Sequence, residues 1–101
     1  MKVTTIIRTE WLIARVMRQL RSISGIRQIY QEQQTPRLVS IVATLSNDDR
    51  YEFYFSRYSG RCGVIKIYRR HPYTEVIKLP DNPSDALNFI KKESLCNAKF
   101  D

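Results

Sequence analysis

Residues 38–56, with the sequence LVSIVATLSNDDRYEFYFS, decide the fold of this chain. Apolar residues alternate with small or polar ones on both sides of residues 46–49, and this alternation is typical of strands with one buried face. Residues 46–49 have short polar side chains that bond to the local backbone, which favours a turn. The stretch therefore predicts a β-hairpin that points Tyr51, Phe53 and Phe55 into the core.

The flanking sequence extends this hairpin into a sheet. Residues 64–69 and 73–79 are rich in β-branched and aromatic residues, which favour strands, and residues 25–30 predict another strand before the hairpin. Residues 31–36 form a polar loop by composition, and residues 2–8 predict a short N-terminal strand. The result is an antiparallel meander of four or five strands.

Two segments carry helix signals. Residues 9–22 repeat apolar side chains at helical spacing after Thr9, a residue type that is suited to cap a helix. Residues 83–93 begin with a proline that follows Asn82, a combination typical of a helix N-terminus. We expect both helices to cover one face of the sheet, which gives an α+β fold with one open sheet face.

The length and the charge of the chain limit what it can be. A chain of 101 residues forms one domain, which we place at residues 1–95, with a flexible tail at residues 96–101. The net charge is +7, and eleven of the seventeen basic residues are arginines, which bind phosphates and carboxylates with two parallel hydrogen bonds. We therefore expect the partner to be nucleic acid or an acidic protein surface.

This charge is concentrated in two blocks of the sequence. Residues 1–37 carry seven basic and two acidic side chains, and residues 57–70 carry five basic side chains and no acid. The remaining residues have a net negative charge, so the two blocks hold the entire positive excess.

Several kinds of site and compartment are disfavoured. Cys62, Cys96 and the single His71 are too few and too scattered for a zinc site, so we expect no metal and no cofactor. The first residues lack the apolar core of a signal peptide, and no apolar run is long enough to span a bilayer. We therefore expect a cytoplasmic protein without a membrane anchor and with reduced thiols, although a disulfide is compatible with the sequence.

The open face of the sheet is the first candidate binding surface. If Ile65 and Ile67 point into the core, strand alternation gathers rings and cations on the opposite face, namely Tyr54, Tyr58, Lys66, Tyr68 and Arg70. Bases stack on such rings while cations contact phosphates, so we predict single-stranded nucleic acid, RNA or DNA, as the ligand. The alternatives are a homodimer interface on this face, or a protein-binding module or inhibitor that docks on an acidic or nucleic-acid-binding surface of a larger protein.

The outer side of the predicted first helix is the second candidate binding surface. Trp11, Arg15 and Arg18 lie opposite the apolar stripe of that helix, which comprises Leu12, Val16 and Leu20. Tryptophan beside arginine is the composition of a binding hot spot. A large apolar side chain left in water costs ~2 kcal/mol, however, so we expect Trp11 to fold onto the sheet edge as part of the core.

Enzymatic function has little support in the sequence. No serine or cysteine lies in a nucleophile motif, and one histidine leaves few options for acid–base catalysis. A minor alternative, by fold-level analogy alone, is a small toxin-type ribonuclease that cleaves RNA with basic and aromatic side chains on a curved sheet. Its site would draw on Arg57, Lys66, Tyr68, Arg69, Arg70 and His71. We predict a binding protein without catalytic activity.

Overall fold

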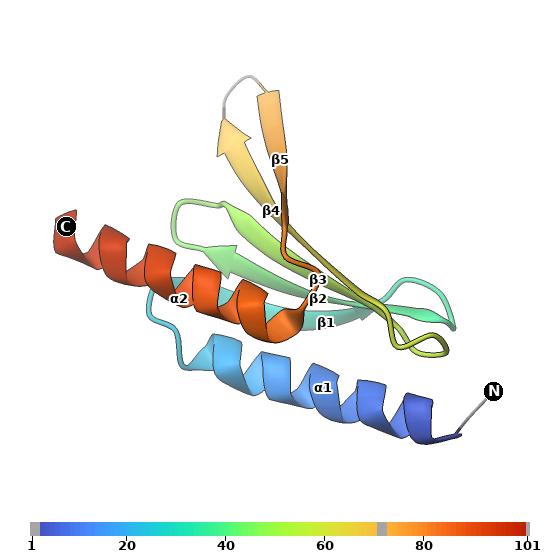
Figure 1. Ribbon diagram of the computed structural model, residues 1–101. Coiled ribbons are helices and arrows are strands. Elements are labelled where there is room, and N and C mark those ends of the chain that lie inside the picture. Colours follow the sequence, from blue (N-terminus) through green and yellow to red (C-terminus); the bar gives the residue numbers. More distant parts are fainter. Residues whose placement is uncertain (1–2, 71–72, 101) are drawn as a thin grey trace.

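The chain folds into a helix, five strands and a second helix (Figure 1). The computed structural model describes residues 3–70 and 73–100, except that the side chains of Val3, Arg70 and residues 95–100 lie outside the description. The elements are α1 (Val3–Arg21), β1 (Ile26–Gln33), β2 (Leu38–Leu45), β3 (Arg50–Ser56), β4 (Cys62–Arg70), β5 (Tyr73–Leu79) and α2 (Pro83–Phe100).

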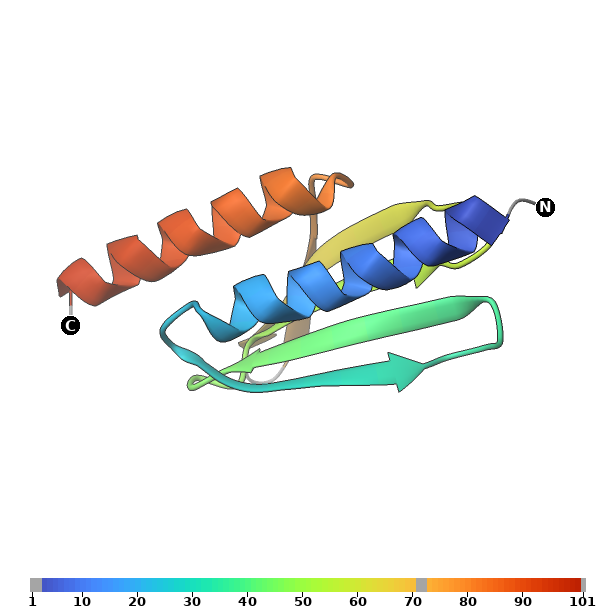
Figure 2. The ribbon, with the colours of Figure 1, turned by 90° about the horizontal axis from the view of Figure 1, so that it is seen from below.

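The five strands form one antiparallel sheet in the order β1-β2-β3-β4-β5, so every connection joins neighbouring strands. Both helices cover the same face of this sheet and lie side by side, as Figure 2 shows from below. A hydrogen bond of 2.9 Å from Lys91 of α2 to the side-chain oxygen of Gln19 joins the two helices. The predicted α+β meander with two helices on one face is confirmed.

The hairpin of β2 and β3 forms the centre of the core, as the sequence predicts. Phe53 lies opposite Ile41 of β2 and opposite Val64 of β4, and all three side chains are at most 1% exposed. The helices cover this row with Ile13, Val16 and Leu20 from α1 and with Ala86, Leu87 and Ile90 from α2. Burial of each of the larger aliphatic side chains contributes roughly 1.5–3 kcal/mol to folding, so this helix–sheet layer is the main source of stability.

The N-terminal strand predicted for residues 2–8 is wrong for the described part of that segment. Residues 3–8 form the first turns of α1, and Thr9 lies inside the helix instead of capping it. Thr9 is 4% exposed, and its hydroxyl donates a hydrogen bond of 2.8 Å to the carbonyl oxygen of Thr5. β-branched residues disfavour a helix only weakly, so packing against the sheet overrides their preference for strands.

Other element boundaries agree for β2, for β5 and for the start of α2, and they differ elsewhere. Asn82 caps α2, because its side-chain oxygen accepts hydrogen bonds from the backbone nitrogens of Ser84 at 2.9 Å and Asp85 at 3.4 Å. The helix continues to Phe100, beyond the predicted end at residue 93. The flexibility expected of residues 96–101 stays a prediction, and residue 101 lies outside the described residues. β1 reaches residue 33, inside the segment predicted as a loop.

Candidate binding surface

The predicted platform of rings and cations is divided between the two faces of the sheet. Tyr54 alternates with the buried residues of β3 and therefore lies on the open face. Lys66 lies opposite the buried Tyr51, so it faces the helices, and Tyr68 shares that face two residues further along β4. The prediction that places these residues on one face is wrong.

The sequence of β4 explains this error. Val64 points into the core and is 1% exposed, whereas Ile65 and Ile67 lie on the open face. Both faces of β4 therefore carry apolar residues, and alternation cannot identify the inner one. The register with β3 decides it, because paired residues in an antiparallel sheet share a face.

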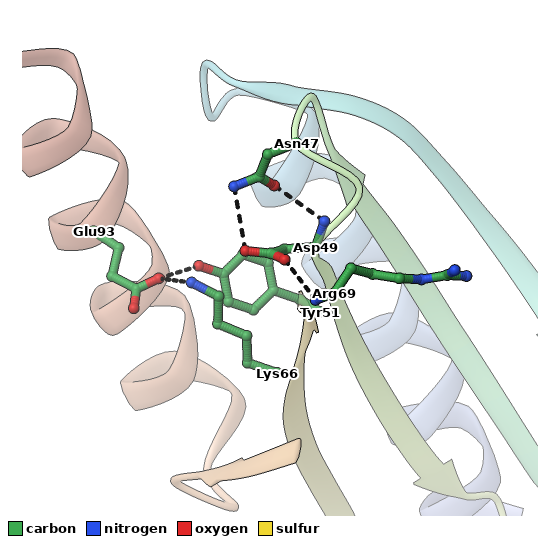
Figure 3. A network of polar contacts seen from close by, with 6 residues as sticks. All are labelled: Asn47, Asp49, Tyr51, Lys66, Arg69 and Glu93. Carbon is green, nitrogen blue, oxygen red and sulfur yellow. Dashed lines mark hydrogen bonds and ion pairs between the residues drawn. The ribbon is translucent and has the colours of Figure 1, made fainter. Parts of the chain in front are cut away.

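Lys66 is a buried cation that holds α2 onto the sheet (Figure 3). Its residue is 5% exposed, and its ammonium group lies 2.6 Å from a carboxylate oxygen of Glu93. The same group lies 5.0 Å from the ring centroid of Tyr51 and 4.3 Å from that of Tyr68. The Tyr51 hydroxyl also donates a hydrogen bond to Glu93, and burial, followed by this bond, raises the pKa of Tyr51. The ammonium group of Lys66 is therefore engaged by contacts within the fold.

The other half of the network in Figure 3 joins the β2–β3 turn to β4. Asp49 is 3% exposed, and its carboxylate accepts hydrogen bonds from the backbone nitrogen of Arg69 at 2.8 Å and from the amide of Asn47 at 3.2 Å. Asp48 supplies the left-handed residue of this turn, with φ of 72°. The buried acid thus has a structural role, and Arg69 takes part with its backbone while its side chain is exposed.

Tyr54 lies on the open face near two acids, Glu52 and Glu32, and one cation, Arg50. Its hydroxyl donates a hydrogen bond of 2.8 Å to the carboxylate of Glu52. Burial, this hydrogen bond and the charges of Glu52 and, more weakly, Glu32 raise the pKa of Tyr54 to about 12, although Arg50 opposes the shift. A phosphate next to Tyr54 would meet two carboxylates and one guanidinium group, so this part of the open face is less suited to nucleic acid than the prediction requires.

Tyr58 is separated from the rest of the predicted platform. It lies in the turn between β3 and β4, where the guanidinium carbon of Arg37 lies 5.7 Å from its ring centroid. The side chain of Arg70, the remaining member of the predicted set, lies outside the described residues.

The residues of the ribonuclease alternative do not form a described cluster of available cations. Arg57 lies 2.9 Å from a carboxylate oxygen of Glu10, and Lys66 is held by Glu93. His71 lies outside the described residues. Two of the cations that would contact RNA are therefore already paired with acids of the fold.

The outer side of α1 presents the most exposed large apolar side chain of the described chain. Trp11 is 77% exposed and Ile7 is 50% exposed, so the expectation that Trp11 joins the core is wrong. The core side of α1 is filled by other residues, and Trp11 lies about half a turn of the helix away from them. Exposed guanidinium groups flank the two apolar side chains. We call this set, Ile7, Arg8, Trp11, Arg15 and Arg18, the α1 surface.

An open groove of about 860 Å³ runs along this side of the helix, and its described lining belongs to α1. Ile7, Trp11 and Leu12 are the large apolar residues of its lining. Glu10, the single acid of α1, also borders the groove, but its carboxylate is engaged by Arg57. The exposed arginines therefore give the α1 surface a positive potential.

No group of three His, Cys, Asp or Glu side chains in residues 3–70 and 73–100 is placed to hold a metal ion. Cys62 is a free thiol, and burial raises its pKa to about 12, which lowers its reactivity as a nucleophile. Neither helix, over its described length, is long and apolar enough to cross a bilayer.

Comparisons of the chain with protein-family models, with curated proteins and with solved structures find no match. The surface itself must therefore indicate the function.

The sequence identified Trp11, Arg15 and Arg18 but missed Ile7 and Arg8, because their segment was expected to form a strand. The helical spacing of Ile7 and Trp11, four residues apart, was the signal that could have found them.

Proposed function

We propose that the protein is a non-enzymatic binding module that docks its α1 surface into an apolar pocket with an acidic rim on a protein partner. The observation that carries this proposal is the 77% exposure of Trp11 on a helix whose other large apolar side chains mostly face the core. Leaving such a side chain in water costs ~2 kcal/mol, and a partner that buries it recovers that free energy.

The spacing of the exposed residues supports a protein partner. Ile7, Trp11, Ala14 and Arg18 follow one another at intervals of four, three and four residues, so they form a line along the outside of α1. Amphipathic helices that lie in the groove of a partner protein use anchors at this spacing. Tryptophan and arginine are also the residue types most enriched among interface hot spots.

The charge distribution defines the rim of the partner site. Arg8, Arg15 and Arg18 are exposed, and no described acid lies within ion-pair distance of them. An acidic rim would attract these groups during encounter and would reject basic partners. The aliphatic side chain of Ile7 favours a protein over nucleic acid at this surface, because it cannot stack on a base as an aromatic ring does.

A protein partner is favoured over nucleic acid bound on the sheet because of the directions in which the side chains of the sheet point. The open-face platform required Tyr54, Lys66 and Tyr68 on one side, and Lys66 and Tyr68 face the helices. Without that platform, the nucleic-acid hypothesis for the sheet rests on net charge, which serves an acidic protein equally well.

A pull-down from lysate, with and without nuclease, tests the proposal. We expect at least one protein to be retained after nuclease treatment and to be lost with Trp11→Ala. Tyr73→Ala is the matched control, because Tyr73 is a 67% exposed aromatic residue on β5, away from α1. If nuclease treatment removed every captured protein, a protein partner would be contradicted. If Trp11→Ala and Tyr73→Ala lowered capture equally, docking at the α1 surface would be contradicted.

A further inference from the structure

A second surface lies at the end of the sheet where two loops meet. Residues 34–37 join β1 to β2, and residues 57–61 join β3 to β4. Figures 1 and 2 both show these loops at the end of the molecule near the start of α1. The backbone nitrogen of Arg57 donates a hydrogen bond of 2.9 Å to the carbonyl oxygen of Arg37, so the loops are directly joined.

Backbone pairing places three arginines of the two loops at this end of the sheet. Arg37 and Arg57 are hydrogen-bonded neighbours, and the carbonyl oxygen of Arg61 accepts a hydrogen bond of 2.9 Å from Ser56, the residue before Arg57. Neither loop contains an acidic residue. Glu10 of α1 approaches Arg57 at 2.9 Å, and this pair leaves Arg37 and Arg61 as the exposed cations of the site.

Tyr58 adds an aromatic ring to these cations. Its residue is 38% exposed, and the guanidinium carbon of Arg37 lies 5.7 Å from its ring centroid. This cation–π contact aligns a guanidinium group with a ring at the surface. We call Arg37, Tyr58 and Arg61 the arginine end.

The loops that carry these side chains are held by local hydrogen bonds. The Thr35 hydroxyl accepts hydrogen bonds from the backbone nitrogens of Arg37 at 3.2 Å and Leu38 at 3.0 Å. In the second loop, the Ser59 hydroxyl accepts one from Arg61 at 3.3 Å, and Gly60 adopts a φ of 71° that favours glycine. Less conformational entropy is therefore lost when a ligand orders the arginines.

The composition of the arginine end differs from that of the α1 surface. The α1 surface combines arginine with Ile7 and Trp11, whereas the loops at the arginine end contain no leucine, isoleucine or valine, and Pro36 is their single apolar aliphatic residue. Guanidinium groups are geometrically suited to phosphate oxygens, and bases stack on tyrosine rings and on guanidinium planes. Guanidinium donors beside an aromatic ring, with Pro36 as the single aliphatic side chain of the loops, suit single-stranded nucleic acid better than a protein pocket.

We propose that the arginine end binds single-stranded nucleic acid, with Arg37 and Arg61 on phosphates and Tyr58 against a base. This site is separate from the α1 surface and does not depend on the protein partner proposed there. Duplexes bind more weakly at the arginine end, because paired and stacked bases hide their faces from Tyr58.

Fluorescence anisotropy with a labelled single-stranded oligonucleotide, at two salt concentrations, tests this proposal. We expect Tyr58→Ala to weaken binding about tenfold and Tyr58→Phe, which keeps the ring, to bind nearly as well as the wild type. Arg37→Gln and Arg61→Gln should each lower the slope of log affinity against log salt by about 0.7 for one lost phosphate contact. Circular dichroism confirms that each variant is folded.

Lys92→Gln is the matched control, since it removes an equal charge from an exposed position on α2, outside both proposed surfaces. We expect it to change oligonucleotide binding less than twofold, the effect of net charge alone. Equal losses with Lys92→Gln and Arg61→Gln would show non-specific attraction and overturn the site. Wild-type protein that binds no oligonucleotide at low salt, or that binds duplex and single strands equally, would also overturn it.

Heparin distinguishes nucleic acid from polyanions in general. It carries closely spaced anions but no bases, so Tyr58→Ala should leave retention on heparin unchanged while it weakens oligonucleotide binding. If Tyr58→Ala lowered retention on heparin as much as it lowered oligonucleotide binding, Tyr58 would only position Arg37 and would not contact a base. Because Trp11→Ala should not affect the oligonucleotide, failure of this site and failure of the protein-partner proposal remain distinguishable.

Discussion

Two blocks of the sequence, residues 1–37 and 57–70, have the same excess of five positive charges, yet the structure uses them differently. In the second block, Lys66 is buried against Glu93 and Arg57 is paired with Glu10. In the first block, the arginines of the α1 surface project into solvent. Charge density along a sequence therefore does not show which cations a partner can reach.

The difference depends on acids that come from distant elements. Glu93 lies in α2, and Glu10 lies in α1, so neither is near its partner in the sequence. A buried charge must be paired, because its desolvation costs several kcal/mol, whereas an exposed charge keeps its hydration. Stability should therefore respond to the paired cations Lys66 and Arg57, and binding should respond to the exposed arginines.

The largest expected effect on stability is that of Glu93→Gln, which leaves the ammonium group of Lys66 buried without its carboxylate. Breaking such a pair costs about 3 kcal/mol, at the lower end of the usual range because the Glu93 side chain is 25% exposed. Urea unfolding monitored by circular dichroism measures this loss. Glu75→Gln, on the exposed strand β5, should change stability by less than about 0.5 kcal/mol. Equal losses of stability with Glu93→Gln and Glu75→Gln would mean that the pair of Lys66 and Glu93 does not stabilise the fold.

A similar contrast is expected between the two sides of α1. Leu20→Ala should cost about 3 kcal/mol by leaving a cavity, because Leu20 is fully buried against the sheet. Arg18→Ala, on the exposed side, should cost less than about 0.5 kcal/mol. The same unfolding experiment measures both variants. A stability loss with Arg18→Ala comparable to that with Leu20→Ala would place the α1 surface in the fold rather than at a binding site.

A smaller effect on stability is expected at Tyr54, on the open face of the sheet. Tyr54→Phe removes the hydrogen bond to Glu52 and should cost on the order of 1 kcal/mol at neutral pH. The pKa of Tyr54 is raised to about 12 from its usual value of 10.0, so the folded state favours the neutral phenol. Its contribution is fully present below pH 10 and is lost as pH rises towards 12.

Unfolding of the wild type and Tyr54→Phe at a series of alkaline pH values measures this dependence. The stability difference between the two proteins should shrink between pH 10 and pH 12. A difference that is constant across this range, or that grows with pH, would show that the Tyr54 hydroxyl is not held by Glu52.

The smallest expected effect on stability is that of Trp11→Ala. Its side chain is largely exposed, so the free energy of unfolding should change by less than about 0.5 kcal/mol. Thermal unfolding of the variant and the wild type measures this difference. A loss near 2 kcal/mol would indicate that Trp11 packs onto the fold, and the α1 surface would then lack its main anchor.

The sequence was sufficient to predict an element where its local pattern is compatible with only one secondary structure. Alternation around residues 46–49 identified the central hairpin, and Asn82 identified the start of α2. It was insufficient for β4, where apolar residues occur on both faces, because the face of Lys66 is decided by its register with β3 and its ammonium group is paired with Glu93, 27 residues away. These long-range partners divided the predicted nucleic-acid platform.

The candidate site was predicted only in part for a related reason. Helical phase correctly placed Trp11, Arg15 and Arg18 on one side of α1, but the usual cost of exposing a tryptophan suggested burial of Trp11. The core beneath α1 is already filled by Ile13, Val16, Leu20 and their neighbours. Exposure of Trp11 therefore follows from the completed packing, which the sequence does not show.

Trp11 is the single tryptophan of the chain, so its fluorescence reports directly on the α1 surface. In the free protein, we expect emission typical of a solvated indole and ready quenching by acrylamide, as its 77% exposure implies. On addition of a partner retained in the nuclease-treated pull-down, and chosen to lack tryptophan, the emission should shift to shorter wavelengths and the quenching should fall. Saturable binding of that partner with no change in Trp11 emission or quenching would contradict the assignment of the α1 surface as the docking site.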